Sequence, residues 1–197
     1  MRVPGSALAG GRWASLCWPR AEAQGRSEPM LSFLFPRLTP GPHKGAALFD
    51  AVTAKAREPH WYIEGEVPDT IDGRFRVLAT VLALVLVRLE QEGEAGDALS
   101  VALTERFIEV MDAEHRELGI GDPSLGKTVR KLVGSVARRV ELWRSAVDGD
   151  WNEAARQSVY AGEGASGAVE HSAGSLKAIW TKLSDIDAAG LAEGRIE

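Results

Sequence analysis

Cysteine is almost absent from this chain, which holds one, Cys17, among 197 residues. A single cysteine excludes an internal disulfide framework and any zinc or iron–sulfur site built on cysteines. Long apolar runs are also missing, since the longest, Val77–Val87, covers about half of the roughly 20 residues that a membrane-spanning helix needs. Basic residues are the minority, 23 against 28 acidic ones. An acidic chain is a poor candidate for wholesale nucleic-acid binding, and we expect no DNA partner.

Helical periodicity is missing from residues 1–44, which hold six of the nine prolines. Such a segment cannot bury enough apolar surface to offset its ordering entropy, so we predict a disordered tail. Two glycines and an arginine at 10–12 interrupt the apolar run of a secretory signal, and two acids before Met30 disagree with a mitochondrial transit peptide. The composition changes at Met30, and we favour the interpretation that residues 1–29 lie upstream of the true start.

From residue 45 onward, apolar residues recur at steps of three and four, which indicates helices buried on one face. The pattern from Ile71 to Glu92 is too long for an ordinary strand, and we predict a buried central helix there. The segment 92–96 contains two glycines, Gly93 and Gly96, and we predict a turn there after the central helix. The sequence thus predicts an all-α fold, one domain of about six helices over 45–189 and a flexible C-terminus at 190–197. The predicted helices cover 46–57, 71–92, 99–118, 124–146, 151–160 and 168–189.

Residues 121–128 read GDPSLGKT and match the phosphate-binding pattern GxxxxGK[ST]. That pattern requires a hydrophobic strand before it, but a helical pattern precedes it here. Pro123 also removes one of the backbone N–H groups that would hold a phosphate. We therefore interpret the segment as a junction between two helices, in which Asp122 or Ser124 caps the second. We expect no nucleotide partner, and a P-loop enzyme is the weakest of the alternatives.

The sequence also lacks the other catalytic and metal-binding motifs that its histidines and acids could suggest. The four histidines lie far apart, and none belongs to the zinc motif HExxH. Asp112 and His115 have the spacing of a di-iron helix, but the second copy that such a site needs is missing. The sequence predicts no enzyme, no cofactor and no metal site.

Charge is distributed unevenly along the chain. Residues 90–122 hold ten acids and two arginines, a balance of −8, whereas 126–144 hold six bases and one acid, a balance of +5. One interpretation is a solvated face that complements the acidic helix before it. The other is a docking surface for an anionic lipid headgroup, RNA or an acidic protein. The candidate docking residues are Lys127, Arg130, Lys131, Arg138 and Arg139.

Four segments carry a resemblance to a known family. They are Trp61-Tyr62, the run VPDTIDGRF at 67–75, Arg88-Leu89, and 111–129, which contains MD, RELGIGD and GK in order. With this ordered spacing, residues 45–147 resemble the ubiquinol–cytochrome c chaperone family, which are assembly factors for cytochrome b of the respiratory cytochrome bc complex. The family's FYGR-like segment is Val-Ala-Arg-Arg at 136–139 here, and residues 148–197 show no resemblance.

The resemblance implies a non-catalytic assembly chaperone that binds newly made cytochrome b or another membrane-protein client. It also implies a small partner protein and a position near the ribosome or the membrane surface. Such a protein is cytoplasmic or peripheral at the inner membrane, and on the matrix side in a mitochondrion. Our candidate client-binding residues are Trp61, Tyr62 and Phe75. The alternative is a generic helical adaptor that docks to anionic membrane, RNA or acidic protein through 126–144.

Overall fold

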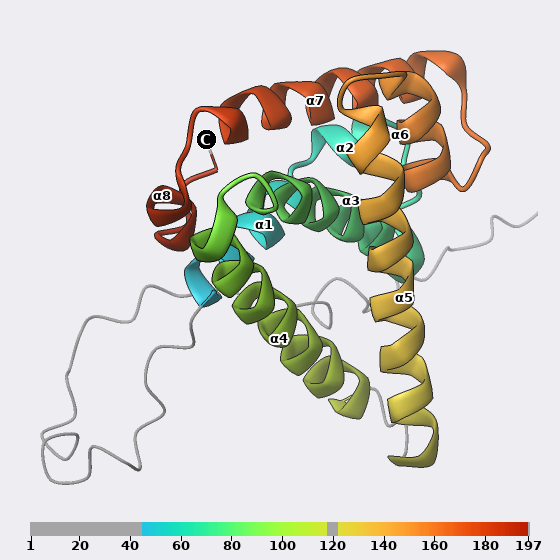
Figure 1. Ribbon diagram of the computed structural model, residues 1–197. Coiled ribbons are helices and arrows are strands. Elements are labelled where there is room, and N and C mark those ends of the chain that lie inside the picture. Colours follow the sequence, from blue (N-terminus) through green and yellow to red (C-terminus); the bar gives the residue numbers. More distant parts are fainter. Residues whose placement is uncertain (1–44, 118–121, 197) are drawn as a thin grey trace, which may run out of the picture. The chain divides into compact units, whose positions relative to one another are not determined.

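The computed structural model describes residues 45–117 and 122–196, which form eight helices and no strand. The predicted tail at 1–44, the start at Met30 and Cys17 lie outside these residues. The helices are α1 (Ala46–Ala56), α2 (His60–Ile63), α3 (Ile71–Leu89), α4 (Gly93–Glu117), α5 (Asp122–Ala146), α6 (Trp151–Tyr160), α7 (Ser166–Ser184) and α8 (Ala188–Ala192) (Figure 1). Six of them have ten or more residues, so the predicted all-α fold of about six helices is confirmed, with α2 and α8 as short additions.

Helix α3 is the buried centre of this fold. Every residue from Val77 to Leu89 is buried except Leu86, which is half-buried. Five helices contact it, namely α1, α4, α5, α6 and α7. The helix begins at a cap in which Thr70 Oγ1 accepts a hydrogen bond from the Gly73 N–H at 3.1 Å. The predicted buried central helix is therefore confirmed.

Helix α4 starts earlier than the sequence indicated. The glycines of 92–96 predicted a turn, but the helix begins at Gly93. A Cβ atom placed on Gly96 would lie 2.0 Å from the carbonyl oxygen of Leu89, so only glycine fits there. The missing side chain lets the first turn of α4 pack directly against the end of α3. This glycine provides a close helix contact, which in sequence is indistinguishable from a turn signal.

The chain stays packed beyond residue 189, where the sequence predicted the domain to end. The expected single helix at 168–189 is divided into α7 and α8, because Asp187 caps a new helix by accepting from the Gly190 N–H at 2.8 Å. Leu191 is 0% exposed and Ile196 is 2% exposed. Their burial differs from the expected flexible C-terminus at 190–197, because apolar side chains there complete the core against α1 and α4.

A buried arginine fixes the end of α7 to the end of α3. Arg88 donates from Nε to the Leu183 carbonyl and from Nη2 to the Ile186 carbonyl, both at 2.9 Å. Glu92 completes the cluster, since its Oε1 lies 2.5 Å from Arg88 Nη2 and its Oε2 accepts from the Ala188 N–H at 2.9 Å. One ion pair therefore satisfies backbone groups on both sides of the α7–α8 turn.

Two polar side chains of α6 fix it between its neighbours. Ser158 Oγ lies 2.5 Å from Thr80 Oγ1 of α3 and accepts from Trp143 Nε1 of α5 at 3.2 Å. The Tyr160 hydroxyl lies 2.5 Å from the Gly65 carbonyl oxygen and 2.7 Å from Ser172 Oγ of α7. Burial raises the pKa of the Tyr160 phenol. These hydrogen bonds determine which face of α6 enters the core.

Replacing Arg88 by methionine should lower the free energy of unfolding by about 2–4 kcal/mol, because two carbonyls and Glu92 lose their partner. Arg74→Met is the matched control. Arg74 pairs with Asp69 at the surface, where such a pair contributes about 0–1 kcal/mol. Urea unfolding of both variants measures the difference, and equal losses would contradict the role given to Arg88.

The Glu92 carboxyl predicts an acid dependence of stability. The hydrogen bond from Arg88, and then that from the Ala188 N–H, hold its pKa below the ordinary value. Its stabilising contribution is therefore complete above the unfolded pKa of about 4.3 and is lost as the pH falls through the lower folded pKa. Glu92→Gln should be less stable than wild type near neutral pH, and the gap should narrow below about pH 4. Urea unfolding across this range, with Glu163→Gln as an exposed control, checks it; a constant gap would refute the assignment.

Candidate functional site

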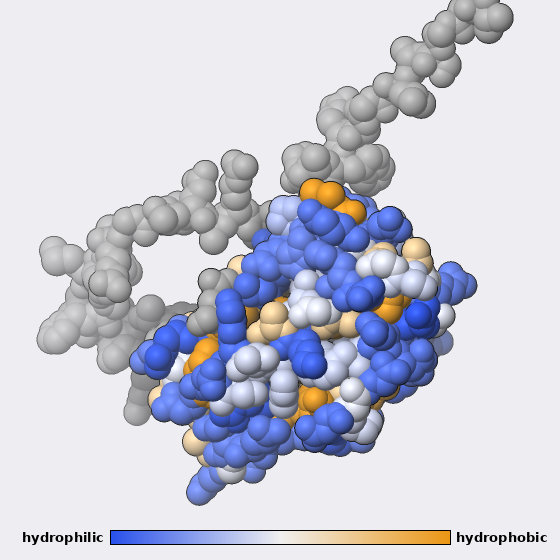
Figure 2. All heavy atoms as spheres, turned by 90° about the horizontal axis from the view of Figure 1, so that it is seen from above, coloured by the Kyte–Doolittle hydropathy of each residue, from blue (hydrophilic) through white to orange (hydrophobic). Residues whose placement is uncertain are grey.

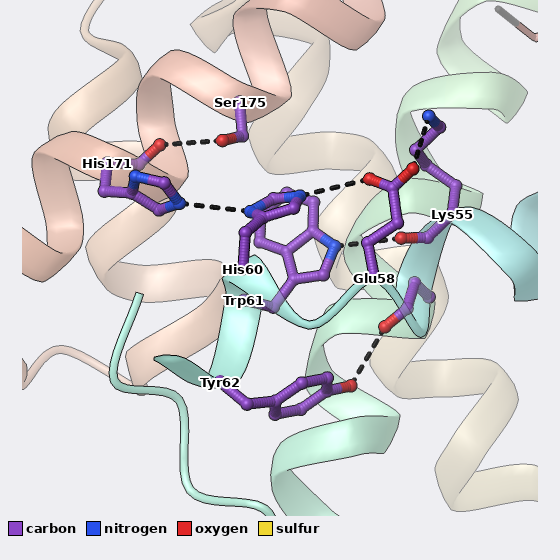
Figure 3. A network of polar contacts seen from close by, with 8 residues as sticks. Lys55, Glu58, His60, Trp61, Tyr62, His171 and Ser175 are labelled. Carbon is purple, nitrogen blue, oxygen red and sulfur yellow. Dashed lines mark hydrogen bonds and ion pairs between the residues drawn. The ribbon is translucent and has the colours of Figure 1, made fainter. Parts of the chain in front are cut away.

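The aromatic pair of the predicted client surface lies on α2 and is tied to α1. Trp61 is 0% exposed, and its indole Nε1 donates to the Lys55 carbonyl at 2.9 Å (Figure 3). The hydroxyl of Tyr62 donates to the Ala56 carbonyl, also at 2.9 Å. Both side chains thus satisfy carbonyls that the C-terminal turn of α1 leaves without helical partners. Trp61 packs in the core and presents no surface in this structure.

Tyr62 and Phe75 keep partial exposure. The guanidinium of Arg74 lies 5.8 Å from the centre of the Tyr62 ring, in the range of a cation–π contact. Burial raises the pKa of the Tyr62 phenol despite this nearby positive charge. The most exposed apolar side chains of this region are Ile63 and Ile71, at 69% and 68%. Neither was predicted to be a surface residue: Ile71 begins the pattern that was assigned to the buried central helix, and Ile63 lies in no apolar stripe.

A chain of polar contacts beside Trp61 joins α1, α2 and α7. His60 Nδ1 lies 3.1 Å from His171 Nε2, and His60 Nε2 lies 3.1 Å from a carboxylate oxygen of Glu58 (Figure 3). The other oxygen of Glu58 accepts from Lys55 Nζ at 2.8 Å. The two histidines are far apart in sequence, so no local pattern indicated their contact. Within the described residues, no group of three histidine, cysteine or acidic side chains is placed to hold a metal ion.

The basic residues of α5 fall into two groups. Lys127, Arg130, Lys131 and Arg138 are exposed, as a docking surface requires. Arg139 differs, because its Nη2 donates to the Ser158 carbonyl of α6 at 2.8 Å and its Nη1 donates to Ser135. Burial, and then the charges of Arg76 and Arg138, lower the pKa of Arg139 to about 10. Arg139 was predicted to be a docking residue together with the other four, whereas in the structure it joins α5 to α6.

An apolar cleft of about 230 Å³ is lined by residues of α3, α4 and α5. The axes of α4 and α5 diverge toward α3 (Figure 1). Phe107 and Val136 are buried at its base, while Val133 is half-buried and Ala137 is exposed. Its walls are formed by Leu82, Leu86, Thr104, Phe107, Val133, Val136, Ala137, Val140, Glu141 and Arg144. The apolar stripes of both helices were predicted to lie in the core. The cleft was not predicted, because hydrophobic periodicity does not show how far two helices diverge.

Charged groups close one end of the cleft. Arg144 donates to both carboxylate oxygens of Glu90, at 2.8 and 2.6 Å, and also to Glu141. The hydrogen bonds that Arg144 donates to these two carboxylates raise the pKa of its guanidinium. Because Glu90 follows α3 and Arg144 belongs to α5, this pair ties the two helices together beside the apolar walls.

The apparent nucleotide motif is helical from Asp122 onward. α5 begins at Asp122, four residues before Gly126, so residues 122–128 belong to the helix rather than to a phosphate-binding loop. This agrees with the interpretation as a helix junction; Gly121 lies outside the described residues.

Hydrophobic residues form small separate patches on the largely hydrophilic face in Figure 2. Among the residues that the structure describes, no helix is both long and apolar enough to cross a membrane.

Known proteins resemble this chain in sequence and in fold. The crystal structure of the Cbp3 homolog from Brucella abortus matches it with a TM-score of 0.67 and 27% sequence identity, covering 78% of this chain and 87% of that one. A comparison with curated proteins gave no match. Residues 64–196 match the ubiquinol–cytochrome C chaperone family, well past residue 147, where the resemblance read from the sequence ended. Because this match spans α3 to α8 and more than half of the chain, the protein belongs to the ubiquinol–cytochrome c chaperone family.

Proposed function

We propose that this protein is a non-catalytic assembly chaperone that binds newly made cytochrome b and assists the assembly of ubiquinol–cytochrome c reductase. The observation that carries the proposal is the family match over 64–196, which includes every helix from α3 onward. Cytochrome b is the client because it is the apolar, membrane-embedded subunit that needs protection before it is inserted. A small partner protein and the ribosome are further partners under this proposal.

The client surface in this proposal centres on Tyr62 and Phe75, which are partly exposed. The exposed Ile63 and Ile71 extend it with apolar side chains. Trp61 has a supporting role, since its buried ring and its hydrogen bond to α1 hold α2 in place. This arrangement combines a rigid base with an apolar surface of limited area, which suits transient binding of a hydrophobic client.

The exposed basic residues of α5 support a docking role, with the protein peripheral at the cytoplasmic face of the inner membrane or, in a mitochondrion, on the matrix side. Lys127, Lys131 and Arg138 share one side of the helix and are solvent-exposed. Anionic lipid headgroups attract such clusters. The same face supports the alternative function, an adaptor that docks to membrane, RNA or acidic protein without a cytochrome client.

Deleting the gene should remove assembled ubiquinol–cytochrome c reductase, because unprotected cytochrome b would not acquire its haem groups. The measurement is the haem b absorbance of membranes, with the wild-type gene returned on a plasmid as the control. Normal haem b absorbance in the deletion strain would disprove the chaperone role and leave the adaptor.

Reversing two charges on the basic face tests docking. Lys131→Glu with Arg138→Glu should weaken cosedimentation with vesicles containing anionic lipid roughly tenfold or more, since each basic residue near such a surface contributes about 1 kcal/mol. The matched control is Lys177→Glu with Arg195→Glu, which changes the net charge equally at exposed positions on other segments. Equal vesicle binding by both double variants would exclude the α5 face as the docking surface.

A further inference from the structure

The apolar cleft between α4 and α5 continues onto the α4 surface. Thr104 lines the cleft, and Val101 and Ile108 lie one helical turn before and after it. Val101 is 59% exposed and Ile108 is half-buried. The α4 wall therefore carries an apolar row that the folded chain leaves partly uncovered.

An acidic border follows this row. Glu105 and Asp112 lie four residues after Val101 and Ile108, and so occupy the neighbouring position on the same side of α4. Glu105 is exposed, and Asp112 accepts a hydrogen bond from Arg116 at 2.8 Å. With Arg116 counted, the α4 border keeps a net negative charge where it meets solvent, carried by Glu105.

The N-terminal half of the α5 side has a basic border, away from the Glu141–Arg144 pair at the other end of the cleft. Arg130 lies three residues before Val133 and seven before Ala137, both of which line the cleft, so the helical repeat places it on the same side. Lys127 lies one turn before Arg130, and both basic residues are exposed. Gly134 adds no side chain beside this wall, and a Cβ there would meet only the end of the Arg138 side chain at 3.7 Å. This border is thus open to a partner.

We propose that the cleft binds an amphipathic α-helix of a protein partner, with an apolar stripe bordered by basic residues on one side and acidic residues on the other. The volume of about 230 Å³ has room for a few apolar side chains but not for a helix backbone, so the partner helix lies across the opening and inserts its anchors. Its basic border faces Glu105 and Asp112, and its acidic border faces Lys127 and Arg130. This site goes beyond the proposed function and does not depend on cytochrome b.

The opposite charges of the two borders select this partner over other classes. A membrane-spanning helix carries few charges along its sides, so it would leave both borders without counter-charges. A nucleic acid would meet the basic border but would be repelled by the acidic one. Only a helix with both kinds of charge satisfies the apolar walls and the two borders together.

Three synthetic peptides with the same apolar stripe provide the test. One has lysines on one border of the stripe and glutamates on the other, the second has lysines on both, and the third has glutamates on both. Fluorescence anisotropy with the full chain should give the tightest binding for the mixed peptide, and salt should reduce its advantage.

Two variants and their controls locate the binding. Ala137→Trp fills the cleft from an exposed position and should weaken mixed-peptide binding roughly tenfold or more, because the apolar anchors lose their space. Ala54→Trp, exposed on α1, should have no effect. Because Asp112 is already paired with Arg116, Glu105→Lys leaves the α4 border with a net positive charge and should transfer the preference to the all-glutamate peptide. Glu163→Lys changes the net charge equally at an exposed site elsewhere and should keep the original order.

Peptide binding that Ala137→Trp leaves unchanged, or an order of affinities that Glu105→Lys leaves unchanged, would overturn the proposal. A chain that is dimeric in sedimentation and becomes monomeric with Ala137→Trp would assign the cleft to a second copy, which also overturns it. The test is separate from that of the chaperone role. Normal haem b in the deletion strain together with the expected peptide order would refute the cytochrome client and support the cleft.

Discussion

A guanidinium buried against the apolar centre of the fold fixes the turn between the last two helices, α7 and α8, to the end of α3. Arg88 is 6% exposed, and a charge at that depth is tolerated only when its donors find acceptors. The end of α7 has the complementary need, because its last carbonyls have no helical partners. Glu92 balances the charge and receives the first N–H of α8. The Arg88 guanidinium and the end of α7 therefore satisfy each other's hydrogen bonds, and Glu92 links both to the start of α8.

Local patterns predicted the helices well and their contacts poorly. The apolar run of α3, interrupted by Thr80, belongs to a pattern too long for an ordinary strand, and it is a buried helix as predicted. Thr70 and Asp150 cap helices, as their residue types favour. Gly96 was wrongly predicted to lie in a turn, because the sequence does not distinguish a glycine that ends a helix from one that allows two helices to pack closely. The His60–His171 contact and the bonds of Arg139 to α6 depend on which helices become neighbours. Tertiary packing decides which helices become neighbours, and hydrophobic periodicity carries no information about it.

The candidate surfaces, too, were predicted correctly where local sequence decides exposure and wrongly where tertiary packing decides it. Residue type correctly indicated an exposed basic face on α5, because charged side chains opposite the apolar stripe of a helix face the solvent. Residue type failed for Trp61, where a large aromatic ring beside a turn served to anchor α2 to α1 rather than to form a surface. The cleft over α3 has no signal of its own, since its walls are the ordinary core positions of two helices that diverge.

The contact at Gly96 has a consequence for the width of that cleft. With 25 residues, α4 is roughly 37 Å long, and its first turn rests directly on the backbone of α3. The cleft walls Thr104 and Phe107 follow this contact about two and three turns later on the same helix. A side chain at residue 96 would move the first turn of α4 away from α3, and would change the distance between the α4 and α5 walls. The carbon atom that Gly96 lacks therefore contributes to the width of the cleft, although it lies outside it.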